Sequence, residues 1–170
     1  MKKILFAAML LVATQNTFAQ IKKAELLATG LTCSMCSNAI SKALKTMPEV
    51  EKVETNLNTN TFTILLKKGN SITANTLKEK VEKAGFFVGS LIITLPFSSS
   101  TVADNEVVKT SNSSYTFIDT KAQTIAGDKK IKVLDKGFVT TKEYKKLTKT
   151  YAKYPSFVEN KAGNYNVKLM

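Results

Sequence analysis

The first half of the chain carries apolar patterns whose period changes from one segment to the next. Residues 22–29 (KKAELLAT) read as a first strand, which closes just before a glycine. An amphipathic helix over about 35–47 is predicted next, and Pro48 ends it. Its apolar residues recur at i, i+3, i+4 and i+7 on one face: Ile40, Ala43, Leu44 and Met47.

A β-hairpin and a second helix follow in the pattern. Apolar and polar residues alternate over 53–57 and again over 62–66, with turn-forming residues 58–60 between them. The second helix is predicted to begin at an N-cap, Thr73, and to end at Gly85. Its buried face is formed by Leu77, Val81 and Ala84.

A last strand over 86–94 completes the first half. The predicted order is β-α-β-β-α-β, which is typical of the ferredoxin-like α+β fold. We therefore expect one small domain over residues 22–95.

The second half is less regular. Serine, threonine and asparagine are frequent over 96–114, which we predict to be a linker with at most a short strand at 107–108. A small α+β unit of unknown role is expected over 115–170. Its strands are predicted from alternating apolar residues at 115–117, 131–133 and 165–169.

One helix is expected in this C-terminal unit, over about 141–153. Thr140 and Glu143 have the spacing of a capping box at its start, and Pro155 is expected to end it. Tyrosine and leucine residues at helical spacing are interpreted as core. The unit shows no cysteine, histidine, phosphate-binding glycine loop or nucleophile–base pair, so the sequence predicts no enzyme there.

The charge of the chain argues against one class of partner. All 25 basic residues are lysines, and with 13 acidic residues the formal net charge is +12. Nucleic-acid-binding proteins rely on arginine for bidentate contacts with bases and phosphates, so we predict no nucleic-acid partner. The lysines are spread along the chain as a solvated surface, whose positive field would attract an acidic partner or an anionic membrane.

The N-terminus has the pattern of a cleavable signal peptide over residues 1–19. A positive start at residues 1–3 precedes an apolar run over 4–13, and the small-residue site Thr17-Phe18-Ala19 precedes Gln20. The apolar run is too short to span a bilayer. We predict a periplasmic or secreted protein, with an uncleaved N-terminal anchor as the alternative.

Cys33 and Cys36 are the two cysteines of the chain, in the stretch GLTCSMCSNAI, and the chain has no histidine. A closed zinc site cannot be built from these ligands alone, whereas two thiolates suit Cu(I), a soft ion that accepts low coordination. A structural disulfide is one alternative in an exported protein. However, closing so short a loop stabilises a fold by only about 2 kcal/mol. A catalytic redox dithiol is the other alternative.

The two cysteines are predicted to occupy different backbone settings. Cys36 falls in the first turn of the helix, where unpaired N–H groups and the positive end of the helix dipole favour thiolate over thiol. Cys33 lies on the preceding loop, so it can adjust its position. One fixed and one adjustable thiolate would form an exposed clamp suited to passing an ion on.

Residues 22–95 resemble the heavy-metal-associated domain, the module of copper metallochaperones, copper-transporting ATPases and periplasmic mercuric-ion-binding proteins. The family signature is roughly G-M-T-C-x-x-C, here Gly30-Leu31-Thr32-Cys33-Ser34-Met35-Cys36. Leu31 departs from the usual methionine, which the family uses as a buried anchor rather than as a ligand. The resemblance also implies an aromatic near the metal just after the second helix, and Phe86 has that position.

The resemblance implies an exported metallochaperone or metal scavenger, not an enzyme. One Cu(I) would be held between Cys33 and Cys36 and passed on by ligand exchange to a metal-accepting protein, such as a transporter, after delivery by a donor. The resemblance is also consistent with a weak homodimer in which two chains share the metal ion. Two alternatives stay open: an Hg(II)-binding protein and a thiol–disulfide oxidoreductase. A third, a metal-free scaffold, is less consistent with the intact motif.

Overall fold

The computed structural model describes residues 20–31, 34–159 and 161–170. The signal peptide predicted over 1–19 lies outside these ranges. The elements in chain order are β1 (Lys23–Thr29), α1 (Ser34–Lys45), β2 (Val50–Asn56), β3 (Thr61–Leu66), α2 (Ala74–Lys83), β4 (Phe87–Val102), β5 (Val107–Lys109), β6 (Ser114–Phe117), β7 (Gln123–Val133), α3 (Thr141–Thr150), α4 (Pro155–Glu159) and β8 (Asn164–Leu169). Within the described ranges, no helix is long and apolar enough to cross a membrane.

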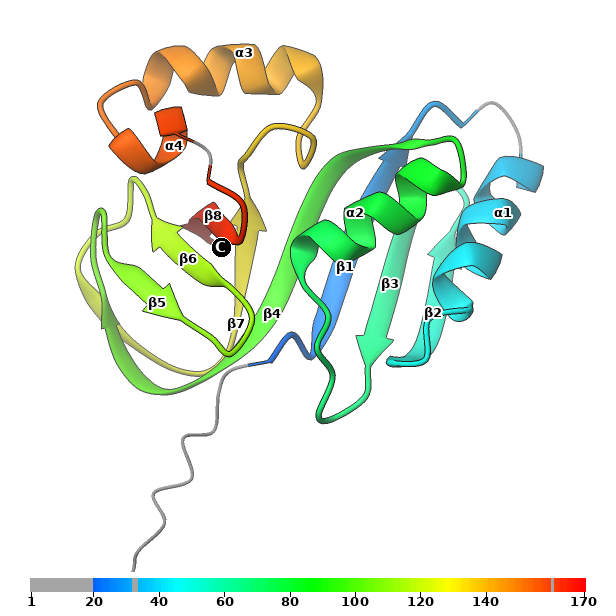
Figure 1. Ribbon diagram of the computed structural model, residues 1–170, viewed down its shortest axis with the longest axis horizontal. Coiled ribbons are helices and arrows are strands. Elements are labelled where there is room, and N and C mark those ends of the chain that lie inside the picture. The colour runs from blue at the N-terminus through cyan, green and yellow to red at the C-terminus, as the bar shows by residue number, and fades with distance from the viewer. Residues whose placement is uncertain (1–19, 32–33, 160) are drawn as a thin grey trace, which may run out of the picture.

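The strands form one continuous sheet in the order β2-β3-β1-β4-β7-β8-β6-β5 (Figure 1). Its first four strands, with α1 and α2, form the N-terminal lobe and have the predicted ferredoxin-like order, which is confirmed. All pairings in this lobe are antiparallel. Alternate residues of β1 and β3 are buried beneath the two helices, as the period-2 pattern predicts.

The ends of α2 follow the local signals in the sequence. The Thr73 side chain accepts a hydrogen bond from the backbone N–H of Thr76 at 3.2 Å, so the predicted N-cap is confirmed. Gly85 lies just beyond the helix with φ of +89°, a left-handed conformation that glycine adopts without strain. Leu77 and Val81 are fully buried, as the helical spacing predicts.

The segment predicted as a linker, 96–114, differs from the expectation because β4 continues into it as far as Val102, whereas β5 agrees with the short strand expected at 107–108. The second half of β4 pairs antiparallel with β7, and Phe97 and Val102 are buried. The serine-rich composition gave no local sign of this strand. Its hydrogen bonds are completed by β7, which lies more than twenty residues further along the chain. Whether residues 22–95 fold by themselves stays a prediction.

The C-terminal lobe comprises β5 to β8 with α3 and α4, and it joins the N-terminal lobe through the β4–β7 pairing (Figure 1). The strands predicted at 115–117, 131–133 and 165–169 are present as parts of β6, β7 and β8. One hydrophobic core runs through both lobes: Ile40 and Phe62 belong to the same buried cluster as Phe117 and Val167. The lobes therefore share their interior as well as their sheet.

A second, smaller cluster lies beneath α3 and α4, formed by Ile118, Leu134, Tyr151, Tyr154 and Phe157. The predicted helix ends earlier than expected, at Thr150, and Pro155 begins α4 instead of only ending α3. Proline suits the first position of a helix because its missing N–H would be unpaired there anyway. Only one half of the predicted capping box forms, since the Thr140 hydroxyl accepts from the Glu143 N–H while the Glu143 carboxylate pairs with Lys132.

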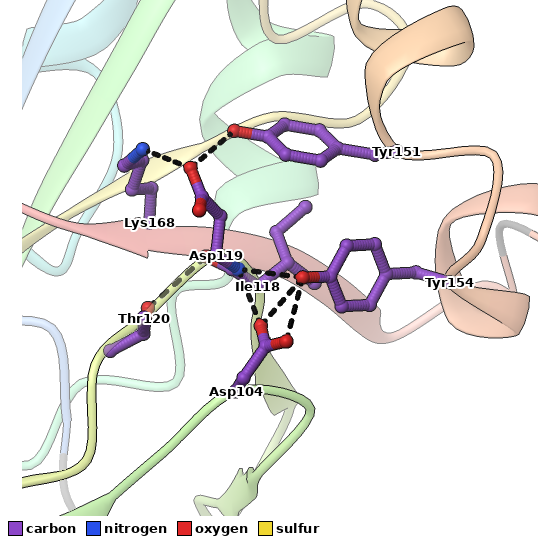
Figure 2. A network of polar contacts seen from close by, with 7 residues as sticks. All are labelled: Asp104, Ile118, Asp119, Thr120, Tyr151, Tyr154 and Lys168. Atoms are coloured by element: carbon purple, nitrogen blue, oxygen red, sulfur yellow. Dashed lines mark hydrogen bonds and ion pairs between the residues drawn. The ribbon is translucent and has the colours of Figure 1, made fainter.

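Two carboxylates fasten this small cluster to the adjoining loops (Figure 2). The Tyr154 hydroxyl donates to Asp104 at 2.7 Å, and this hydrogen bond holds the pKa of Asp104 below its usual value. Asp119 accepts from Lys168 Nζ at 2.5 Å and from the Tyr151 hydroxyl at 3.2 Å, and the lysine chiefly holds its pKa low. These contacts anchor the buried tyrosines at their polar ends.

Candidate metal centre

Cys36 lies in the first turn of α1, as predicted, and is half-buried. The first turn contains no acidic residue, and the last turn carries Lys42 and Lys45. The N–H groups and the positive dipole end at the start of the helix therefore act on this thiol without an opposing carboxylate in the same turn. Such a setting favours the thiolate, the form of cysteine that binds metal.

Cys33 and Thr32 lie outside the described residues. That Cys33 and Cys36 hold one metal ion between them therefore stays a prediction. Before them, Gly30 has φ of +88°, a left-handed conformation in which a side chain would be strained. Leu31 is partly buried and packs against the main core, in agreement with its expected role as an anchor. Met35 has 77% of its surface exposed, which agrees with its interpretation as a residue pointing away from the site.

Other metal ligands do not gather elsewhere in the ranges 20–31, 34–159 and 161–170. No group of three or more His, Cys, Asp or Glu side chains there could hold a metal ion. The candidate centre therefore consists of Cys36, as placed by the structure, and Cys33, as placed by the sequence.

The two phenylalanines after α2 have different environments. Phe86, which the resemblance places near the metal, is partly buried and packs against the core. A role for it as a shield of the ion stays a prediction. Phe87, which the sequence pattern did not single out, is 66% exposed at the start of β4. A Cβ built on Gly30 would lie 4.0 Å from Phe87 Cδ2, so this ring borders Gly30. Gly30 begins the loop that leads to the cysteines, which we call the metal loop.

A β-bulge explains why Phe87 faces solvent. Leu27 pairs with Ser90 and the next residue of β1 pairs with Val88, so Gly89 is an extra residue in β4. After the bulge the odd-numbered residues from Leu91 to Phe97 are buried, whereas before it Val88 is buried and Phe87 is exposed. Because a one-residue shift exchanges the two faces of a strand, plain alternation would have assigned Phe87 to the core. A glycine inside an apolar strand was the signal for it.

The fold of the N-terminal lobe agrees with a comparison against known families. Residues 25–87 match the sequence model of the family described as "Heavy-metal-associated domain". No curated protein matches the chain.

Several solved structures are similar to this part of the chain. A yeast copper transporter domain, CCC2A, is 34% identical, with 38% of this chain and 86% of that domain covered and a TM-score of 0.35. The N-terminal domain of a potential copper-translocating P-type ATPase from Bacillus subtilis, in its Cu(I)-loaded state, is 31% identical, with 39% and 82% covered and a TM-score of 0.35. A chain of the Atx1–Cu(I)–Ccc2a complex is 32% identical, with 42% and 92% covered and a TM-score of 0.35.

Proposed function

Since this chain belongs over residues 25–87 to the heavy-metal-associated domain family, we propose that it binds one soft metal ion between the thiolates of Cys33 and Cys36 and passes it on by ligand exchange. The observation that carries the proposal is the place of Cys36 in the first turn of α1 within the matched segment. The protein is then a metal-binding protein rather than an enzyme.

Cu(I) is the ion we propose, because two thiolates satisfy a soft ion of low coordination. With two thiolates bound, the site carries one net negative charge, which the positive end of the α1 dipole stabilises. Hg(II) shares the preference for thiolates and is the second candidate. Zn(II) requires further ligands, and the chain has no histidine to supply them.

Ligand exchange needs a thiolate that can leave the ion while the other still holds it. Cys36 sits on a helix whose Ile40 and Leu44 side chains are fully buried, so the backbone of the helix is held against the core. Cys33 precedes the helix on the loop after Gly30 and Leu31. An incoming thiolate would displace this loop ligand first, through a three-coordinate ion shared with the partner.

The partners follow from this chemistry. We propose a metal donor and a metal acceptor that carry thiolates of their own, with a transporter as one form of acceptor. We also propose that the protein acts outside the cytoplasm, on the strength of the signal-peptide pattern over residues 1–19.

The test is an anaerobic titration of the reduced protein, residues 20–170, with Cu(I) against a chromogenic chelator, with Hg(II) and Zn(II) in parallel. We expect one tightly held Cu(I) per chain, lost in Cys33→Ser and in Cys36→Ser. Met35→Leu is the matched control, because Met35 lies between the cysteines and is exposed. Undiminished retention in either serine variant would refute the clamp. If the wild type holds no ion but readily exchanges a Cys33–Cys36 disulfide, the redox alternative holds instead.

A further inference from the structure

A groove of about 490 Å³ lies between the two lobes, and we call it the interlobe groove. The N-terminal lobe contributes Thr29, Phe87 and Val88 to its lining, and the C-terminal lobe contributes Val139, Thr140 and Tyr144, among others. A ferredoxin-like domain alone would have no such groove, because six of the ten residues that line it come from the segment between β7 and α3 and from α3 itself.

The groove opens beside the metal loop. Thr29 is the last residue of β1, and Gly30 borders Phe87, as described above. The end of β1 and the start of α3 lie at the same end of the sheet (Figure 1). A protein that exchanges an ion with the cysteine loop must approach this end of the molecule, so it meets the rim of the groove.

The walls of the groove are held in place by contacts within the fold. Val139 is buried, and its backbone forms isolated β-bridges with Ser90 of β4 and with Lys136. Tyr144 lies 5.7 Å, between ring centroids, from Phe157 of the small cluster. A preformed apolar groove loses little conformational entropy when it receives a side chain.

Exposed apolar side chains stand at the same end. Phe87, 66% exposed, forms part of the groove lining, and Met35, 77% exposed, lies in the first turn of α1. Large apolar side chains on the surface beside a functional loop are typical of an interaction site.

Helix α3, whose first residues line the groove, carries positive charge on its exposed side. Helix α3 exposes Lys142, Lys145, Lys146 and Lys149. Its one carboxylate, that of Glu143, forms an ion pair with Lys132, with 2.7 Å between Oε1 and Nζ. None of the ion pairs between described residues involves a lysine of α3. Lys136 and one acidic residue, Glu82, also line the groove.

We propose that the interlobe groove and the lysines of α3 form the docking surface for an acidic protein partner. The partner inserts an apolar side chain beside Phe87 while its carboxylates face α3, and its own thiolates meet the cysteine loop. This inference rests on the proposed function and gives the C-terminal lobe a role in it, namely the choice of partner.

Charge complementarity selects this occupant over two others. A second copy of the chain would bring the same positive net charge, which is +12 for all 170 residues, and would be repelled. An anionic membrane would satisfy the lysines, but it presents no side chain to fill a concave apolar groove.

The test uses a short synthetic peptide of Asp and Glu residues around a central Leu pair, labelled for fluorescence anisotropy. A peptide with Ser in place of Leu and a peptide with Lys in place of the acids serve as controls. We expect the acidic Leu peptide to bind best, with an affinity that falls as salt is raised. We expect Phe87→Ser, and separately Lys145→Glu with Lys149→Glu, which follow Thr141 of the groove lining along one side of α3, to weaken that binding by at least about tenfold.

Matched control variants lie on β5, at the far edge of the sheet: Val107→Ser and Lys109→Glu should leave peptide binding unchanged. All four variant proteins should retain Cu(I), so failure of the docking surface is distinguishable from failure of the metal site. Equal loss in the β5 variants, or unchanged binding in the groove variants, would overturn the proposal. Binding to phosphatidylglycerol vesicles without peptide binding would assign the surface to a membrane, and self-association in sedimentation would assign it to a second copy.

Discussion

Asp135 offers a pH-dependent test of how the C-terminal lobe is held together. The residue is 3% exposed, and its carboxylate accepts hydrogen bonds from the backbone N–H and the side-chain amide of Asn166, at 2.8 and 2.7 Å. Burial nevertheless dominates and raises the pKa of Asp135 to about 6. The charged form is therefore disfavoured in the folded protein, because the two hydrogen bonds do not replace the lost water.

The sign of the effect on stability follows from this upward shift. Between the ordinary carboxyl pKa and about 6, the folded Asp135 binds a proton that the unfolded chain has released. The contribution of this group to stability is therefore fully present at low pH and is lost as the pH rises through about 6. With 1.36 kcal/mol per pKa unit, the full loss amounts to roughly 3 kcal/mol, most of it between pH 4 and pH 7.

Urea denaturation at intervals from pH 4 to pH 7 measures this directly. In the wild type, Asp135 lowers the free energy of unfolding as the pH rises from 4 to 7, and in Asp135→Asn this decrease should be absent. The difference in free energy of unfolding between the two proteins should therefore change by roughly 2 to 3 kcal/mol over this range. Asp128→Asn is the matched control, since Asp128 is exposed and pairs with an exposed lysine. Parallel profiles for wild type and Asp135→Asn would refute the reasoning, because no proton would then be linked to folding at this site.

Three further changes test other parts of the structure. A Cβ at Gly89 would lie 2.5 Å from Thr29 Cγ2, so Gly89→Ala should lower the free energy of unfolding by about 1 to 3 kcal/mol, as measured in urea; a change within experimental error would contradict the tight bulge. Tyr154→Phe removes the main hydrogen bond to Asp104, so the pKa of that carboxyl should rise in an NMR titration, and a constant pKa would assign the shift to other neighbours. A protein ending at Leu95 should stay folded by circular dichroism but aggregate more readily, because the edge of β4 that β7 covers becomes exposed; an unfolded product would show that the lobes form one cooperative unit.

Local chemistry explains which parts of the fold were predictable. The elements of the N-terminal lobe follow from the spacing of Ile40 and Leu44 on one helix face, from the Thr73 cap and from the alternation in the hairpin, all of which act within a few residues. The same holds for Thr140 at the start of α3. The position of Cys36 in the first turn of α1 was predictable for the same reason, since the cysteine stretch directly precedes the helical pattern.

The long second half of β4 and the exposure of Phe87 could not be read from local pattern. Polar residues of β4 such as Ser100 and Thr101 become strand because β7 supplies their hydrogen-bond partners. Phe87 faces solvent because the bulge at Gly89 fits against Thr29, a residue sixty positions earlier.

By itself, the sequence determined the order of the elements in the N-terminal lobe, through the period of its apolar residues, and two cysteines without histidine predict a soft, thiolate-type site there. Only the tertiary structure decided what surrounds that site. The pairing of β4 with β7 brings α3 and its lysines to the end of the sheet where Phe87 borders the metal loop. Such pairing depends on contacts between residues far apart in the chain. The entropy lost in closing the loop between two strands, and the packing that offsets it, are properties of the whole fold and not of any one segment.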